Sequence, residues 1–121
     1  MKIGCPKEIK PQEFRVGMTP NAALEAVKNG HQVIIEAGAG TGAGFEDAAY
    51  VAAGATIIEP AAEVFATADM IVKVKEPQAQ ERKMLREGQV LFTYLHLAPD
   101  PEQTKDLIAS GATCIAYETV T

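Results

Sequence analysis

The chain has 121 residues, of which 47% are hydrophobic and 22% are charged. These proportions are typical of one folded domain and exclude a disordered or fibrous chain. Sixteen acidic side chains against eleven basic ones give a net charge of -5, which disfavours binding to nucleic acid. The apolar runs are far shorter than the roughly 20 residues of a membrane span, and the first residues lack an apolar secretory signal. We therefore expect a cytoplasmic protein that binds neither a membrane nor nucleic acid.

Short apolar runs alternate with helical patterns along the chain. Strands are expected near residues 2–5, 32–36, 56–58, 70–75, 90–94 and 113–116, where apolar side chains cluster. The first helix begins after Thr19 as cap, has Pro20 at its first position and stops before Gly30. The last helix repeats this scheme, with Asp100 as cap, Pro101 at its first position and Gly111 beyond its end. Between them, helices are expected near residues 45–53, 60–66 and 78–86.

This alternation predicts an α/β fold in a single domain over residues 1–121. Strand–helix–strand units with right-handed crossovers give a doubly wound, mainly parallel sheet of about six strands, Rossmann-like or flavodoxin-like. The nearly continuous hydrophobicity of the strands indicates helices on both faces of the sheet. In such sheets ligands bind beyond the carboxyl ends of the strands. The loops at that edge are therefore the candidates for a functional site.

Three of these loops carry side chains suited to a small acid. Arg15 lies late in the loop after the first strand, and its planar guanidinium matches a carboxylate. Pro77 ends the fourth strand and places Lys75 at its exit. His96 leaves the fifth strand and can exchange a proton near neutral pH. Together they predict a pocket for a small anion with a reactive carbonyl, such as a 2-oxo acid.

Each of these residues also has a structural interpretation. Arg15 can be a solvated loop residue, and His96 can be a structural histidine whose hydrogen bonds are satisfied. Glu118, after the sixth strand, lies at the same edge and can orient a cation or face solvent.

The two lysines of the fourth strand leave a similar choice. Lys73 and Lys75 are expected to project to the same side, because side chains alternate along a strand. Both can pair with a nearby carboxylate, either Glu76 or Glu36, instead of binding a substrate. This structural interpretation has more weight for Lys73 than for Lys75.

A glycine-rich segment at residues 38–43 fits the form G-x-G-x-x-A and follows an apolar strand. A dinucleotide fingerprint runs straight into a helix, whereas here Gly44 follows and the helical pattern resumes only near Phe45. We therefore expect a flexible connection that lines the crevice, and no cofactor-binding residues in this chain.

Two cysteines, Cys5 and Cys114, lie within apolar runs. Their separation matches neither a zinc site nor a redox Cys-x-x-Cys pair. Two reduced, buried thiols and no metal site are expected.

Several longer motifs resemble one known family over essentially the whole chain. The family is the N-terminal domain shared by alanine dehydrogenases and proton-translocating transhydrogenase subunits. The resemblance lies in residues 4–8, 15–16 with 19–20, 38–40 through 44–45, 68–69 to 73–77, and 116–119. Residues 93–98 resemble the alanine dehydrogenase branch, because the transhydrogenase branch lacks a histidine equivalent to His96. Phe14 departs from the asparagine expected before the arginine.

The resemblance implies an NAD-dependent alanine dehydrogenase, which converts L-alanine reversibly to pyruvate and ammonia. Arg15 and Lys75 would bind the substrate carboxylate and carbonyl oxygen, and His96 would serve as acid and base, with Lys75 as a second catalytic residue. NAD would bind mainly to a C-terminal domain that is absent from this chain. We therefore expect a partial polypeptide, inactive alone, from a protein that assembles as a hexamer. A transhydrogenase alpha subunit and a non-catalytic module that binds a small acid remain alternatives.

Overall fold

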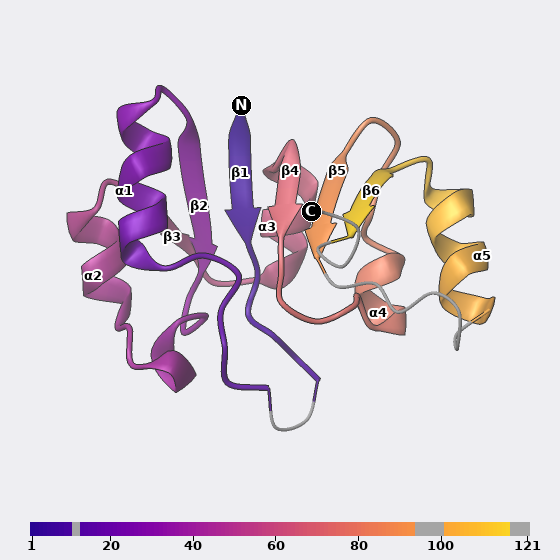
Figure 1. Cartoon of the computed structure of the whole chain (residues 1–121), viewed down its shortest axis with the longest axis horizontal. Coiled ribbons are helices and arrows are strands. Elements are labelled where there is room, and N and C mark those ends of the chain that lie inside the picture. Colours follow the sequence, from indigo (N-terminus) through magenta and orange to yellow (C-terminus); the bar gives the residue numbers. More distant parts are fainter. Residues whose placement is uncertain (11–12, 94–100, 117–121) are drawn as a thin grey trace.

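Six parallel strands form one sheet in the computed structural model, which describes residues 1–10, 13–93 and 101–116 (Figure 1). Their order across the sheet is β3-β2-β1-β4-β5-β6. The strands are β1 (Lys2–Cys5), β2 (Gln32–Glu36), β3 (Thr56–Ile58), β4 (Met70–Val72), β5 (Val90–Thr93) and β6 (Thr113–Ala116). The α/β fold with a parallel six-stranded sheet is therefore confirmed.

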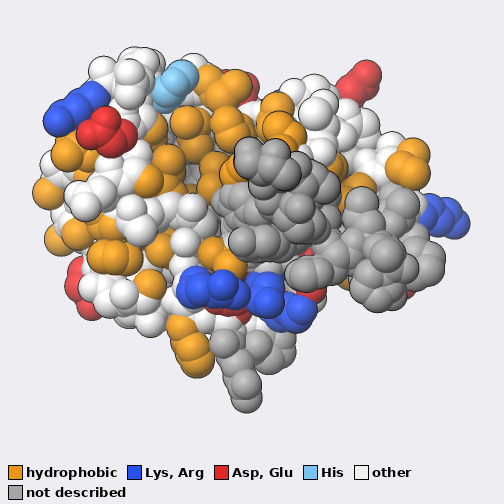
Figure 2. All heavy atoms as spheres, in the orientation of Figure 1, with side chains coloured by type: hydrophobic (Ala, Val, Ile, Leu, Met, Phe, Trp, Pro, Cys, Tyr) orange, Lys and Arg blue, Asp and Glu red, His pale blue; other side chains and the backbone are white. Residues whose placement is uncertain are grey.

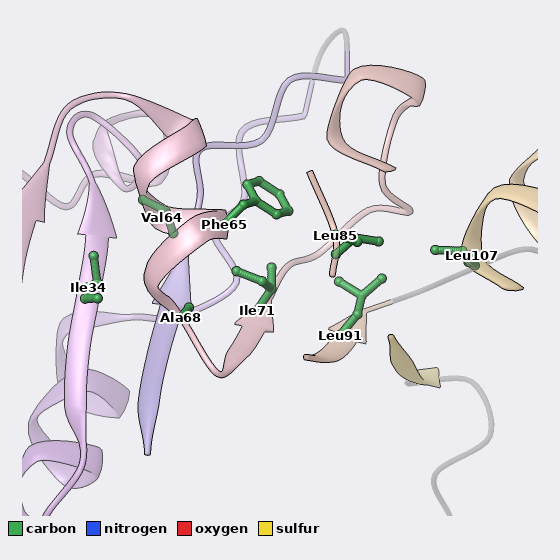
Figure 3. Packing of buried hydrophobic residues seen from close by; sticks show 8 residues of the cluster. All are labelled: Ile34, Val64, Phe65, Ala68, Ile71, Leu85, Leu91 and Leu107. Atoms are coloured by element: carbon green, nitrogen blue, oxygen red, sulfur yellow. The ribbon is translucent and has the colours of Figure 1, made fainter. Parts of the chain in front are cut away.

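Helices cover the two faces of this sheet and bury two hydrophobic clusters. Neighbouring residues of β2 belong to different clusters, because successive side chains of a strand point to opposite faces of the sheet. Val33 and Ile35 pack with residues of α1 (Pro20–Lys28) and α2 (Asp47–Ala52). Ile34 belongs to the other cluster, which is shown in Figure 3. That cluster includes residues of α3 (Ala61–Thr67) and α5 (Pro101–Ser110), and α4 (Ala79–Arg82) packs against α5.

The start of α1 follows its predicted chemistry. The Thr19 hydroxyl accepts a hydrogen bond from the Ala22 N–H at 3.2 Å, and Pro20 takes the first helical position. Proline fits there because its missing N–H has no partner within the helix. Gly30, just beyond the helix, has a φ of 88°, which a glycine adopts without strain.

Three elements are shorter than predicted: α2 by three residues, and β4 and α4 because side chains compete for the backbone. β4 was expected over residues 70–75 but ends at Val72, since the N–H groups of Val74 and Lys75 bind the Glu8 carboxylate instead of a neighbouring strand. The helix expected over residues 78–86 spans only Ala79–Arg82. Beyond it, the Arg86 N–H donates to the Gln89 side chain and not to a helical carbonyl.

The sheet order reverses direction between β1 and β4. From β1 the chain first builds outward through β2 and β3, then returns to place β4 on the other side of β1. Such a reversal opens a crevice at the carboxyl ends of the two central strands, where α/β proteins bind their ligands. The loop after β1 and the segment after β4 meet at this crevice. None of the helices that the structure describes is long and apolar enough to cross a membrane.

Candidate functional site

The long loop between β1 and α1 is folded back against the exit of β4. Gly17 makes this approach possible, because a Cβ atom there would lie 2.5 Å from the Val72 carbonyl oxygen and 2.9 Å from the Lys73 Cα. The Tyr50 hydroxyl anchors the next residue by donating to the Met18 carbonyl at 2.8 Å. The returning half of the loop is thus fixed beside β4.

Arg15 lies in this returning half and is bound edge-on by the carboxylate of Glu13. Arg15 Nε donates to Glu13 Oε2 at 3.0 Å, and Nη2 donates to Oε1 at 2.9 Å. The Arg15 backbone N–H donates to the same carboxylate at 2.8 Å. The arginine side chain is 64% exposed and that of Glu13 only 5%. These hydrogen bonds hold the pKa of Glu13 below its usual value.

Lys75 follows the exit of β4, against which this loop packs. It is half-buried just beyond β4, and the positive charge of its ammonium also lowers the pKa of Glu13. Among residues 1–10, 13–93 and 101–116, that ammonium forms no ion pair. The alternative partners are engaged elsewhere: Glu76 pairs with Lys10, and Glu36 accepts the Lys7 N–H at 2.7 Å.

The structure therefore places the loop that carries Arg15 beside the strand exit that carries Lys75, at the point where the sheet order reverses. Figure 2 shows Lys and Arg side chains gathered at the edge toward which the strands of Figure 1 point. His96 and Glu118 lie outside the described residues.

A small cavity opens beside Arg15. Its volume is about 260 Å³, and its walls come from the loop after β1 and from the glycine-rich segment after β2. Gly38, Ala39, Thr41 and Gly42 contribute to the wall, as predicted for a connection that lines the crevice. Thr41–Ala43 form a 3₁₀ turn, and α2 starts only at Asp47. The segment therefore lacks the direct entry into a helix that a dinucleotide fingerprint requires.

Lys73 is not part of this cavity but of a buried ion cluster. Its ammonium lies 3.1 Å from Glu8 Oε1 and 3.1 Å from Glu81 Oε2, and its side chain is 1% exposed. Lys73 therefore pairs with carboxylates, as its structural interpretation held, but the named partners are wrong: they are Glu8 and Glu81 and not Glu76 or Glu36. The two lysines also have different surroundings, because β4 ends before Lys75 and strand alternation does not extend to it.

Glu8 and Glu13 are the two residues of the site that sequence reasoning did not single out. Glu8 lies 65 residues from Lys73 in the chain, so no local pattern connects them. Glu13 stands two residues before Arg15, a spacing that permits the observed ion pair but is common in solvated loops. Glu81 had a sequence signature, since it lies three residues after Gln78, whose N–H donates to it at 2.9 Å.

The cysteines are free, as predicted, but only Cys5 is fully buried. Burial, together with the negative charge of Glu8, raises the pKa of the Cys5 thiol to about 12. Cys114 is half-buried, and this burial also raises its pKa. The described part of the chain contains no group of three or more His, Cys, Asp and Glu residues that could hold a metal ion.

Comparison with known proteins agrees with this fold. Residues 4–121 match the family described as alanine dehydrogenase/PNT, N-terminal domain. The alanine dehydrogenase of Halomonas elongata is 57% identical over 121 residues, which are 100% of this chain and 33% of the relative. A solved L-alanine dehydrogenase superposes with a TM-score of 0.96 at 51% identity, covering 98% of this chain and 33% of that one.

A transhydrogenase from Sinorhizobium meliloti is a more distant neighbour. It superposes with a TM-score of 0.91 at 32% identity, covering 98% of this chain and 34% of that chain. This chain spans about a third of the length of the curated relatives it matches. By fold and by sequence, the chain belongs to the alanine dehydrogenase/PNT N-terminal domain family.

Proposed function

We propose that this chain is the substrate-binding, N-terminal part of an NAD-dependent alanine dehydrogenase, which oxidises L-alanine to pyruvate and ammonia. The observation that carries the proposal is that the loop bearing Arg15 packs against the exit of β4, just before Lys75, beside a cavity of about 260 Å³ that Arg15 lines. A guanidinium in the wall of a small cavity, with a lysine at the neighbouring strand exit, suits a small organic acid. The names of the relatives, which are alanine dehydrogenases, agree with such a substrate.

In this proposal Arg15 holds the carboxylate of the substrate, because a guanidinium donates two parallel hydrogen bonds to a carboxylate. Lys75 donates to the carbonyl oxygen of pyruvate and stabilises negative charge that develops there. His96 removes a proton from the amine of alanine and returns protons when the imine is hydrolysed to pyruvate and ammonia.

NAD is the proposed hydride acceptor, and the described residues do not fit its pyrophosphate. The glycine-rich segment passes into a 3₁₀ turn and not into a helix N-terminus, which is where a dinucleotide is held. No step is therefore assigned to NAD on this chain. We propose that NAD binds mainly to a C-terminal domain of the full-length protein, for which the relatives' threefold greater length leaves room.

The cellular setting is also proposed from the family resemblance. We infer a cytoplasmic enzyme whose full-length form is a homo-hexamer that binds L-alanine and pyruvate as small-molecule substrates. Light scattering of the full-length protein after size-exclusion chromatography tests the assembly, and a mass other than that of six chains would overturn it.

The experiment that tests the function uses the full-length protein that the gene encodes. NADH formation with L-alanine, and its loss with pyruvate and ammonium, should be measured for the wild type and for Arg15→Ala, Lys75→Ala and His96→Ala. Each cation variant removes charged hydrogen bonds and should weaken pyruvate binding by roughly 10- to 100-fold. Lys28→Ala, which removes an exposed cation in the last turn of α1, is the matched control and should bind normally.

Three results would contradict the proposal. Unchanged pyruvate affinity in both cation variants would remove Arg15 and Lys75 from the site. Near-normal turnover in folded His96→Ala would reject its role as acid and base. A full-length protein that binds pyruvate but forms no NADH with alanine would be a binding module instead of a dehydrogenase.

A further inference from the structure

The carboxylate of Glu8 makes three contacts with one short stretch of chain at the exit of β4. Oε2 accepts the Val74 N–H at 3.0 Å, and Oε1 accepts the Lys75 N–H at 3.2 Å. Oε1 also lies 3.1 Å from the Lys73 ammonium. Glu8 is 7% exposed, so these charge-assisted hydrogen bonds are sheltered from water. The loop after β1 is thereby joined to the exit of β4 by a single side chain.

The peptide groups of Lys75 are held from a second direction as well. The Thr93 hydroxyl, at the end of β5, donates to the Lys75 carbonyl at 2.8 Å, and Thr93 is 0% exposed. The last sheet-like bond of this segment is the one from the Lys73 N–H to the Phe92 carbonyl, at 3.0 Å. Buried side chains from two other elements therefore fix the backbone of Lys75 where strand pairing has stopped.

We propose that Glu8 is a positioning residue, which orients Lys75 toward the substrate through the N–H groups of Val74 and Lys75. This inference rests on the proposed function, in which Lys75 binds the carbonyl oxygen. The competing explanation is that Glu8 only neutralises the buried ammonium of Lys73. Glu81 contacts that same ammonium at 3.1 Å, but within the described residues it makes no hydrogen bond to the Lys75 peptide, so it separates the two roles.

The test compares Glu8→Gln with Glu81→Gln in the full-length enzyme. Each variant keeps the side-chain shape and leaves Lys73 with one carboxylate, so both should lower the urea midpoint of unfolding. Glu8→Gln also replaces one of the two oxygens that accept the Val74 and Lys75 N–H groups with an NH2 donor, which disturbs the backbone at Lys75. We expect its kcat/KM for pyruvate to fall about tenfold or more. Glu81→Gln should keep the wild-type value.

A double-mutant cycle with Lys75→Met shows whether Glu8 acts through Lys75. Pyruvate affinity is measured by calorimetry, with each glutamine variant alone and combined with Lys75→Met. If Glu8 positions Lys75, the effect of Glu8→Gln disappears once Lys75 is methionine. An effect of Glu8→Gln that persists undiminished, or an equal loss of affinity in Glu81→Gln, would overturn the inference.

The outcomes distinguish this inference from the proposed function. If Lys75→Met alone leaves pyruvate binding unchanged, the function assigned to Lys75 fails, and the inference fails with it. If Lys75→Met weakens binding but Glu8→Gln does not, only the inference fails. Should Glu8→Gln not fold, Thr93→Val carries the test, because it removes the hydrogen bond to the Lys75 carbonyl, on the peptide next to the one that Glu8 binds. Thr93→Val should weaken pyruvate binding, whereas Thr93→Ser, which keeps the hydroxyl, should restore it. Equal pyruvate affinity in the two variants would refute the positioning role.

Discussion

Substituting alanine for Gly17 should separate the two cations of the site. The added Cβ would lie 2.5 Å from the Val72 carbonyl oxygen and 2.8 Å from the Val72 carbonyl carbon. Both distances are below 3.0 Å, which real Cβ atoms essentially never show. These neighbours are backbone atoms of β4, which is paired to β1 and β5 and cannot give way easily. The loop must therefore move, and with it Arg15, two residues away. We expect a loss of about 1–3 kcal/mol in the free energy of unfolding.

The assay is urea unfolding together with calorimetry of pyruvate binding, on the full-length protein. A displacement of Arg15 by about 1 Å should weaken catalysis by up to roughly 100-fold. Gly4→Ala is the matched control, because its Cβ would meet the Ala68 and Val64 side chains at 2.7 and 2.8 Å, beneath α3 and away from the loop. It should lower stability but leave pyruvate affinity intact. Wild-type stability and affinity in Gly17→Ala would refute this reasoning.

Three further predictions concern single groups of the domain. Because burial raises its pKa from 9.0 to about 12, Cys5 should hold about a thousandfold less thiolate than an ordinary cysteine. Mass spectrometry after brief iodoacetamide treatment should find Cys114 modified first, and Cys5 only after unfolding. Thr19→Ala removes the cap of α1 and should cost ~1 kcal/mol in urea unfolding, whereas Thr19→Ser should cost little. The pKa of Glu13 is lowered by Arg15, so its stabilising effect is complete above its usual 4.5 and is lost as the pH falls through the lowered value. The difference in urea midpoint between wild type and Glu13→Gln should therefore shrink on acidification, and a constant difference would contradict this.

Local chemistry accounts for the elements that were predicted well. Four strands have the predicted bounds, namely β1, β2, β3 and β6, because each is a short apolar run. The start of α1 was predictable because Thr19 and Pro20 act within three residues of themselves. The end of β4 was not, because the group that stops it, Glu8, comes from a distant part of the chain.

The candidate site was likewise predictable from the sequence only in part. Placing Arg15 and Lys75 at one edge required only that parallel strands share a direction, which the alternation of strands and helices implies. Their partners could not be read from spacing, since Lys73 contacts carboxylates on two other segments, and the predicted Glu76 and Glu36 bind different groups.

The sequence by itself determined the α/β class, the positions of most strands and the cations that line the edge of the sheet, because periodicity and capping act over a few residues. Only the tertiary structure decided that β4 lies next to β1, that the loop packs against β4 at Gly17, and that Glu8 binds the backbone of Val74 and Lys75. Those contacts join residues far apart in the chain. They depend on how the whole sheet packs, and a local sequence pattern does not predict that packing.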